Sequence, residues 1–279
     1  SFRGLDEMSF DEKFAARPGV VYLVGAGPGD PGLLTLKARG LLASCDVVIY
    51  DNLVNPEILR FAQRDVERID VGKIGGGRHT PQEEINMLLI ERARRGERVV
   101  RLKGGDPFLF GRGGEEAEAL RRASIPFEVV PGVSSALAVP AYAGIPLTHR
   151  ELSSSVVVLS GAKAQSGEVP GPIFRSLAQA DTIVVLMGTA HLRAIADELI
   201  AAGRSPDTPV AVIRWGTYRG QRTITGTLRT IADECERAGV RAPTVIVIGE
   251  VVALREKLQW FEKQSAHQAA REEFAFVAE

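Results

Sequence analysis

Short apolar runs rich in β-branched residues alternate with amphipathic stretches from residue 20 onward. Such runs are typical of buried strands, whereas apolar residues spaced three or four apart are typical of helices. In the first part of the chain the pattern predicts strands at 20–25, 47–50, 98–102 and 127–130, with helices at 33–44 and 80–95. At the second helix, Thr80-Pro81-Gln82-Glu83 predicts an N-cap, a proline at the first helical position and a capping-box glutamate.

A second series of the same kind follows. It predicts strands at 155–160, 182–187, 209–214 and 245–249, with helices near 191–202 and 228–238. The segment 221–228 alternates threonine with apolar or glycine positions, which favours an antiparallel strand in the second sheet. Strands that alternate with helices predict an α/β protein whose sheets are largely parallel and covered by helices.

The segment 143–151 contains glycine and proline but no hydrophobic period, which is typical of a junction between domains. We therefore expect two α/β domains, at 18–148 and 149–262. Residues 1–17 and 263–279 are expected to be an N-terminal and a C-terminal tail.

The charge balance argues against some classes of partner. The chain has 34 lysines and arginines against 35 aspartates and glutamates, a net charge of −1, so no overall positive field favours nucleic acid or a membrane surface. No apolar run approaches the roughly 18 residues of a membrane span. The N-terminus also lacks the basic and apolar regions of a signal peptide. These features predict a cytoplasmic protein that binds any anionic ligand through locally placed cations.

The two cysteines, Cys45 and Cys235, are far apart and lack the spacing of metal ligands. We expect both to be packing residues, with no disulfide framework and no metal site.

A glycine-rich loop, Gly25-Ala-Gly-Pro-Gly-Asp-Pro-Gly32, follows the first predicted strand and superficially resembles a dinucleotide-binding turn. The third glycine of that pattern is replaced by Asp30, whose carboxylate would compete with a pyrophosphate at a helix N-terminus. Pro28 and Pro31 also remove two amide donors. The loop is therefore interpreted either as a contact for another ligand or as a tight turn between strand and helix.

A second glycine-rich segment, 101–116, begins at the end of the strand predicted at 98–102. Open α/β sheets bind ligands at the carboxyl ends of their strands, and Gly104-Gly105 would let backbone groups face a bound molecule. The alternative is a polar turn with solvated charges.

Four segments in order, 25–31, 102–116, 130–135 and 142–150, resemble motifs of the tetrapyrrole methyltransferase family, and most closely its uroporphyrinogen-III C-methyltransferases. The resemblance runs from about Val20 to Trp260. It implies two α/β domains with an active-site cleft between them, a homodimer, and S-adenosylmethionine bound in a manner unlike that of Rossmann-type methyltransferases. The implied reaction methylates uroporphyrinogen III at carbons 2 and 7, giving precorrin-2 by way of precorrin-1, and S-adenosylhomocysteine.

The resemblance also implies a set of residues that contact the methyl donor. They are Pro28, Gly104, Gly105, Asp106, Leu109, Ser134, Ser135, Met187 and Gly216. Met187 is alternatively a buried side chain at a strand end, and the two serines are alternatively helix caps.

The implied substrate carries many carboxylates, which arginine binds with two parallel hydrogen bonds. The family motifs assign this task to Arg112 and Arg150, and place Met187 near the substrate as well. Glu115 either orients Arg112 by an ion pair or occupies the favourable first turn of the next helix. Without the resemblance, each arginine would be interpreted as a surface residue.

The resemblance assigns the proton acceptor to Asp51 and the proton donor to Lys73. Arg112 is a third candidate for this step, but a guanidinium is a poor base, so we favour Asp51 as the base. An ordinary turn aspartate and a solvated loop lysine are the alternatives.

Three rival functions are considered. One is a later methyltransferase of the corrin pathway, the second is a nicotinamide-dependent oxidoreductase, and the third is a sensor that binds adenosine ligands without turnover. The motifs at 111–116 and 146–150 disfavour the first, and Asp30 with the two prolines disfavours the second. The length leaves no room for the dehydrogenase and ferrochelatase module fused to some family members, so the resemblance implies a stand-alone enzyme.

Overall fold

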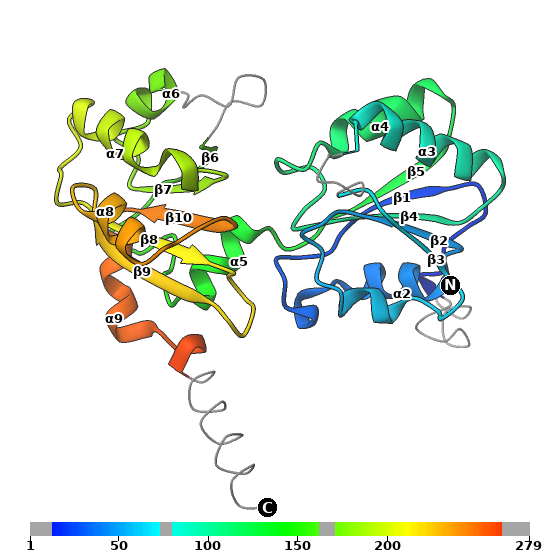
Figure 1. Ribbon diagram of the computed structural model, residues 1–279, viewed down its shortest axis with the longest axis horizontal. Helices are drawn as coiled ribbons and strands as arrows, with labels where there is room; N and C mark the ends of the chain where they lie inside the picture. The colour runs from blue at the N-terminus through cyan, green and yellow to red at the C-terminus, as the bar shows by residue number, and fades with distance from the viewer. Residues whose placement is uncertain (1–12, 73–79, 162–170, 264–279) are drawn as a thin grey trace, which may run out of the picture. The chain divides into compact units, whose positions relative to one another are not determined.

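The computed structural model describes residues 13–72, 80–161 and 171–263 (Figure 1). It divides into two compact units, Ser1–Ser134 and Ser135–Glu279. The boundary lies earlier than the junction expected at 148/149. The reason is helix α5 (Ser135–Tyr142), which packs on strands of the second sheet, so that Ala136 and Val139 share an apolar cluster with Val184.

The first unit contains a five-stranded sheet with the order β3-β2-β4-β1-β5, in which every neighbouring pair is parallel. Its strands are β1 (Val21–Gly25), β2 (Val47–Tyr50), β3 (Glu67–Asp70), β4 (Val99–Lys103) and β5 (Phe127–Val130). Its helices are α2 (Leu36–Ser44), α3 (Gln82–Arg94) and α4 (Gly113–Arg122), with short 3-10 turns η1 (Pro31–Leu33) and η2 (Ile58–Phe61). As Figure 1 shows, α2 covers one face of the sheet, and α3 and α4 cover the other.

The second unit contains a mixed five-stranded sheet with the order β6-β7-β10-β8-β9. Its strands are β6 (Val156–Ser160), β7 (Thr182–Leu186), β8 (Pro209–Arg214), β9 (Arg222–Thr227) and β10 (Thr244–Ile248). Its helices are α5, α6 (Gly171–Ser176), α7 (Leu192–Ala201), α8 (Ile231–Arg237) and α9 (Arg255–Leu258), with 3-10 turns η3 (Thr189–His191) and η4 (Glu250–Leu254). Apolar residues of α6, α7 and α8 pack on one face, and those of α5 and η4 pack on the other.

Strand direction in the second sheet differs from the prediction. The antiparallel strand predicted at 221–228 is confirmed as β9. The expectation of a largely parallel sheet is wrong here, because β10 runs antiparallel to both β7 and β8 and only β6 and β7 are parallel. A continuous apolar run such as 244–248 shows that a strand is buried on both faces, but it carries no information about direction.

Two local details also depart from the sequence pattern. Strand β3 was not predicted because Glu67, Arg68 and Asp70 are exposed at the edge of the sheet and give no apolar run. Helix α3 begins at Gln82, with Pro81 in the N-cap position and no side-chain capping bond, so the predicted capping box at Thr80 does not form.

Both cysteines are buried in apolar clusters, Cys45 at 2% exposure and Cys235 at 6%. Burial raises the pKa of the Cys45 thiol to about 12 and that of Cys235 to about 11. The prediction that both are packing residues is confirmed. Within the described ranges, no helix has the length and apolar character needed to cross a membrane, and no cluster of His, Cys, Asp and Glu could hold a metal ion.

Candidate active site

The loops that follow β1 and β4 form one continuous surface at the carboxyl edge of the first sheet. The amide of Gly105 donates to the carbonyl of Gly27 at 2.7 Å, and the amide of Gly27 donates back to Gly105 at 3.2 Å. Just before this bridge, the amide of Ala26 donates to the carbonyl of Lys103 at 2.7 Å. The two glycine-rich segments singled out in the sequence are therefore paired with each other.

Glycine is required where the loops after β1, β4 and β5 touch. A Cβ atom at Gly25 would lie 2.5 Å from the Cα of Gly132 and 2.6 Å from the carbonyl oxygen of Gly105. A Cβ atom at Gly132 would lie only 2.2 Å from that same oxygen. Gly105 also adopts a φ of +67°, which other residues rarely adopt. The carboxyl ends of β1, β4 and β5 are thus in direct backbone contact, with no side chains between them.

Asp106 joins two of these loops through its carboxylate. Its Oδ1 accepts from the amide of Phe108 at 2.9 Å, and its Oδ2 accepts from the amide of Gly132 at 3.0 Å. Since each carboxylate oxygen has two lone pairs, Asp106 retains acceptor capacity for a ligand. From the sequence, Asp106 was predicted to contact the methyl donor. That it also links the loops after β4 and β5 was not predicted.

The loop after β1 differs from a dinucleotide turn. Asp30 precedes η1 and accepts from the amide of Gly32 at 2.7 Å, while α2 begins only at Leu36. The loop therefore does not lead directly into a helix N-terminus, as pyrophosphate binding requires, and Asp30 caps a short turn instead. The half-buried Pro28 lies in this loop, and Asn55 donates to the carbonyl of Gly29 at 2.8 Å.

Asp51 follows β2 at the same edge of the sheet. Arg101 donates to its Oδ1 at 2.5 Å, and the ammonium of Lys103 lies 3.6 Å from its Oδ2. Both cations also bind Glu116 of α4, at 3.0 Å each. Sequence reasoning missed Arg101 and Lys103 as partners of Asp51, and Glu116 as the carboxylate that binds both cations. The available signal was the pair of charges inside the apolar run Val99–Lys103. Lys73 lies outside the described residues.

Arg112 and Glu115 form the expected ion pair, with Nε to Oε1 at 2.9 Å and Nη2 to Oε2 at 2.5 Å. This hydrogen bonding lowers the pKa of Glu115 and raises that of Arg112. Both side chains are more than half exposed, so dissolved salt screens the pair. Arg112 has a φ of 59° and Phe110 a φ of 53°, which places their loop in an uncommon backbone conformation. Leu109, 38% exposed, lies in this loop.

The remaining predicted residues belong to the second unit, except for the buried Ser134, which ends the first. Met187 follows β7 with a φ of 56° and is 56% exposed, so its interpretation as a buried strand-end side chain is wrong. Gly216 follows β8, and a Cβ atom there would lie 2.3 Å from Val139 of α5. Because β7 and β8 both run antiparallel to β10, Met187 and Gly216 lie at the same edge of this sheet. Ser135 begins α5 and is half-buried.

Arg150 is exposed and lies in the segment between α5 and β6. The structure thus groups Pro28, Asp51, Gly104, Gly105, Asp106, Leu109, Arg112, Glu115 and Ser134 in the first unit and Ser135, Arg150, Met187 and Gly216 in the second.

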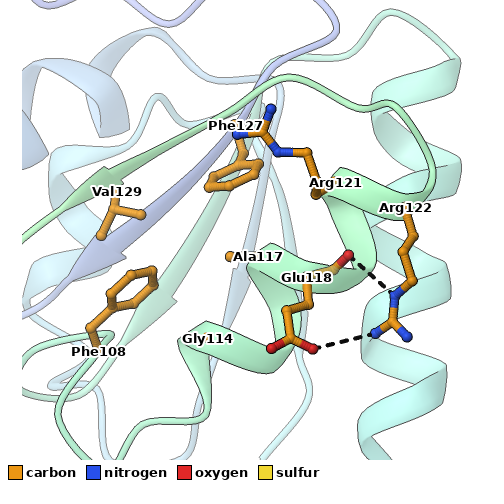
Figure 2. A pocket seen from close by; sticks show the side chains of 8 residues that line it. All are labelled: Phe108, Gly114, Ala117, Glu118, Arg121, Arg122, Phe127 and Val129. Carbon is orange, nitrogen blue, oxygen red and sulfur yellow. Dashed lines mark hydrogen bonds and ion pairs between the residues drawn. The ribbon is translucent and has the colours of Figure 1, made fainter.

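A separate open hollow of about 600 Å³ lies against α4 and the edge strand β5 (Figure 2). Its lining residues are Phe108, Gly114, Ala117, Glu118, Arg121, Arg122, Phe127 and Val129. The guanidinium of Arg121 lies 5.5 Å from the ring centre of Phe127, a cation–π contact. None of the residues predicted to bind the methyl donor or the tetrapyrrole substrate lines this hollow.

Comparison with known proteins places these features in a family. The family model described as "Tetrapyrrole (Corrin/Porphyrin) Methylases" matches residues 20–232. A curated relative, siroheme synthase of Ectopseudomonas mendocina, is 52% identical over 244 residues, which is 88% of this chain and 53% of the relative. The chain thus spans about half the length of the curated relatives that it matches.

Solved structures match along almost their whole length. The uroporphyrin-III C-methyltransferase of Thermus thermophilus, crystallised with S-adenosylhomocysteine, has a TM-score of 0.73 and 43% identity, covering 84% of this chain and 99% of that one. A cobalt precorrin-4 methyltransferase has a TM-score of 0.75 and 31% identity, covering 84% and 96%. The fold expected from the sequence, two α/β units of the tetrapyrrole methyltransferase type, is confirmed. The chain belongs to the tetrapyrrole (corrin/porphyrin) methylase family.

Proposed function

We propose that this chain transfers methyl groups from S-adenosylmethionine to carbons 2 and 7 of uroporphyrinogen III. The products are precorrin-2, formed through precorrin-1, and S-adenosylhomocysteine. The observation that carries the proposal is the 43% identity to the uroporphyrin-III C-methyltransferase of Thermus thermophilus, because it extends over 99% of that chain. The carboxyl-edge surface of the first unit supports it independently.

The residues at this edge fit a sulfonium methyl donor. Gly104 and Gly105 bear no side chains, so a ligand can approach their backbone groups. Asp106 supplies a carboxylate with remaining acceptor capacity, which suits a cationic ligand that carries amino and hydroxyl groups. When bound, the donor supplies an electrophilic methyl group. Pro28, Leu109 and Ser134 from the first unit, and Ser135, Met187 and Gly216 from the second, complete the proposed donor contacts.

Arg112 and Arg150 are proposed to bind the carboxylates of the macrocycle. The pair with Glu115 uses Nε and Nη2 of Arg112, so among the described residues Nη1 is left for a substrate carboxylate. Glu115 therefore orients the guanidinium without occupying all of its donors. Met187, with its exposed thioether, is proposed to contact the substrate as well as the donor.

Asp51 is proposed to accept the proton that leaves the macrocycle. In each transfer a pyrrole carbon forms a bond to the methyl carbon as the bond from that carbon to sulfur breaks, with its electron pair passing to sulfur. The methylated carbon then carries four bonds to carbon and no hydrogen, so the cationic macrocycle loses a proton from another position, and the Asp51 carboxylate accepts it. Asp51 suits this role because its side chain is 32% exposed at the carboxyl edge, whereas Arg112 is a guanidinium and a poor base. Lys73 remains the proposed proton donor.

The curated relatives are named siroheme synthases, which supports a product that enters sirohaem formation. The similarity to a cobalt precorrin-4 methyltransferase connects the fold to the cobalamin branch as well. A homodimer and a cytoplasmic location remain predictions.

The proposal is tested by incubating the purified chain with S-adenosylmethionine and enzymatically generated uroporphyrinogen III. We expect a product with two added methyl groups, heavier by two CH2 units because each transfer also releases a proton, and two equivalents of S-adenosylhomocysteine, by mass spectrometry and chromatography. Methylation of a later intermediate only would instead support the corrin-pathway rival. Donor binding without any product would support the sensor.

Removal of the Arg112 side chain is expected to weaken substrate capture. In Arg112→Ala, KM for uroporphyrinogen III should rise roughly tenfold to a hundredfold, the equivalent of one charge-assisted hydrogen-bonded contact, while kcat changes little. The matched control is Arg122→Ala, which removes another exposed arginine from the vicinity of a glutamate, Glu118, in α4. Steady-state kinetics measures both, and an unchanged KM in Arg112→Ala would exclude Arg112 as a substrate anchor.

A further inference from the structure

A group of charged side chains lies buried next to Asp51, on the face of the first sheet that α3 and α4 cover. Arg101 and Lys103 come from β4, and Glu116 comes from α4. Their side chains are 2%, 3% and 0% exposed, whereas that of Asp51 is 32% exposed. Two buried cations and a buried carboxylate are thus connected to one carboxylate that reaches solvent.

Arg101 uses all three nitrogens of its guanidinium. Nε donates to Glu116 Oε1 at 3.0 Å, and Nη2 donates to Asp51 Oδ1 at 2.5 Å. Nη1 donates to the carbonyl oxygens of Ile49 at 3.4 Å and Leu102 at 3.5 Å. Because the guanidinium is planar and rigid, these bonds together fix the position of Nη2 beside Asp51.

Burying the Glu116 carboxylate costs desolvation free energy, which makes it a poor means of stabilising the fold. Its Oε1 accepts from Arg101, from Lys103 at 3.0 Å and from Gln82 at 3.3 Å. Its Oε2 is buried and has no hydrogen-bond partner among the described residues. Buried ion pairs can often be replaced by apolar residues without loss of stability, so stability alone does not account for this group.

A second aspartate–arginine pair, at the opposite end of the same two strands, provides a comparison. Asp46 precedes β2 and Arg98 precedes β4, and Arg98 donates to Asp46 through Nε at 3.0 Å and Nη2 at 2.6 Å. Both side chains are more than one third exposed. An ion pair between the ends of β2 and β4 therefore forms without a buried carboxylate beside it. In the pair at Asp51, by contrast, the arginine also binds the buried Glu116.

We propose that Arg101 is a positioning residue for Asp51, and that Glu116 holds Arg101 in place for this task. The inference rests on the proposed function, in which Asp51 accepts the proton of the methylated ring. Arg101 engages Oδ1 and restricts rotation of the carboxylate. Oδ2 accepts no hydrogen bond from the described residues, since Lys103 is 3.6 Å away, and is the oxygen left to take the proton.

Arg101→Lys tests the proposal, because lysine keeps the charge but cannot bind Glu116, Asp51 and the strand carbonyls together. We expect kcat to fall roughly tenfold to a hundredfold, a part of the 10² to 10⁴ that a positioned base supplies. The KM for uroporphyrinogen III and the Kd for S-adenosylhomocysteine should stay within about twofold, because a side chain that is 2% exposed offers no contact to either. The matched control is Arg98→Lys, which makes the same change in the exposed pair and should leave kcat unchanged.

A double-mutant cycle separates positioning from a general structural effect. If Arg101 acts through Asp51, then Arg101→Lys should cause no further loss of kcat in an Asp51→Asn background. If Arg101→Lys lacks the cooperative unfolding transition of the wild type, Glu116→Gln takes its place in the same cycle, because it keeps the size of the side chain and removes its charge.

Three results would overturn the proposal. These are a wild-type kcat in Arg101→Lys, a raised KM with unchanged kcat, and losses that add fully in the double variant. Failure of the proposed function is distinguishable, because the wild-type chain itself would then yield no methylated uroporphyrinogen. That result would remove both proposals, whereas an active wild type with a fully active Arg101→Lys variant would remove this one alone.

Discussion

Asp51→Asn is expected to lower kcat for the methylation of uroporphyrinogen III by roughly two to four orders of magnitude, the usual contribution of a positioned general base. Asparagine has nearly the same shape and can still accept a hydrogen bond from Arg101, but it cannot take up the proton that leaves the ring. The KM values for both substrates should change little. Product formation in single-turnover and steady-state assays measures the effect.

The control for Asp51→Asn is Asp46→Asn, at the other end of β2. Arg98 hydrogen-bonds to Asp46 and holds the pKa of that carboxyl below its usual value. Since this pair is partly exposed, its loss should cost about 1 kcal/mol or less of stability and leave kcat unchanged. Unfolding midpoints of both variants show whether the assays compare folded proteins. If Asp51→Asn retains kcat within about threefold of the wild type, another group accepts the proton.

Gly132→Ala is expected to disrupt the carboxyl edge of the first sheet. The new Cβ would lie 2.2 Å from the carbonyl oxygen of Gly105 and 2.7 Å from the Cα of Gly25. Both are backbone atoms, so relief requires the loops after β1, β4 and β5 to separate. We expect a loss of stability of about 1–3 kcal/mol or more and a large loss of S-adenosylhomocysteine affinity, measured by urea unfolding and calorimetry.

Gly114→Ala is the matched control, because a Cβ atom at this position in α4 meets nothing within 4 Å. Alanine should leave stability unchanged or raise it by up to about 1 kcal/mol, since it favours the helix. A Gly132→Ala variant with the stability and ligand affinity of the wild type would show that the three loops do not depend on bare backbone at this point.

Much of the first unit could be predicted from the sequence. The strands at 47–50 and 127–130 were located without error, because short runs such as Val47-Val-Ile-Tyr50 form only where both faces of a sheet are covered. Strand β3 escaped prediction because exposed polar residues at a sheet edge look like a loop in sequence. Its pairing with β2 is a tertiary contact that no local pattern reveals.

For the candidate site, too, some residues could be predicted from the sequence, whereas the contacts between them could not. Glycines 104 and 105, Asp106 and Asp51 are predicted as candidate site residues because family motifs and strand-end positions are visible along the chain. The bond from Asp106 to the amide of Gly132 joins residues 26 apart, and that from Arg101 to Asp51 joins residues 50 apart. Contacts at such separations follow from strand order, which the hydrophobic pattern does not contain.

The sequence by itself determined the family, the alternation of strands and helices and the residue types at the strand ends, because these follow from local hydrophobic spacing and contiguous motifs. Only the tertiary structure decided the antiparallel course of β10, the backbone contact among Gly25, Gly105 and Gly132, and the burial of Arg101 and Glu116 beside Asp51. The physical reason is that side-chain burial and charge pairing depend on which strands become neighbours. That choice is made by the packing of whole layers rather than by any one segment.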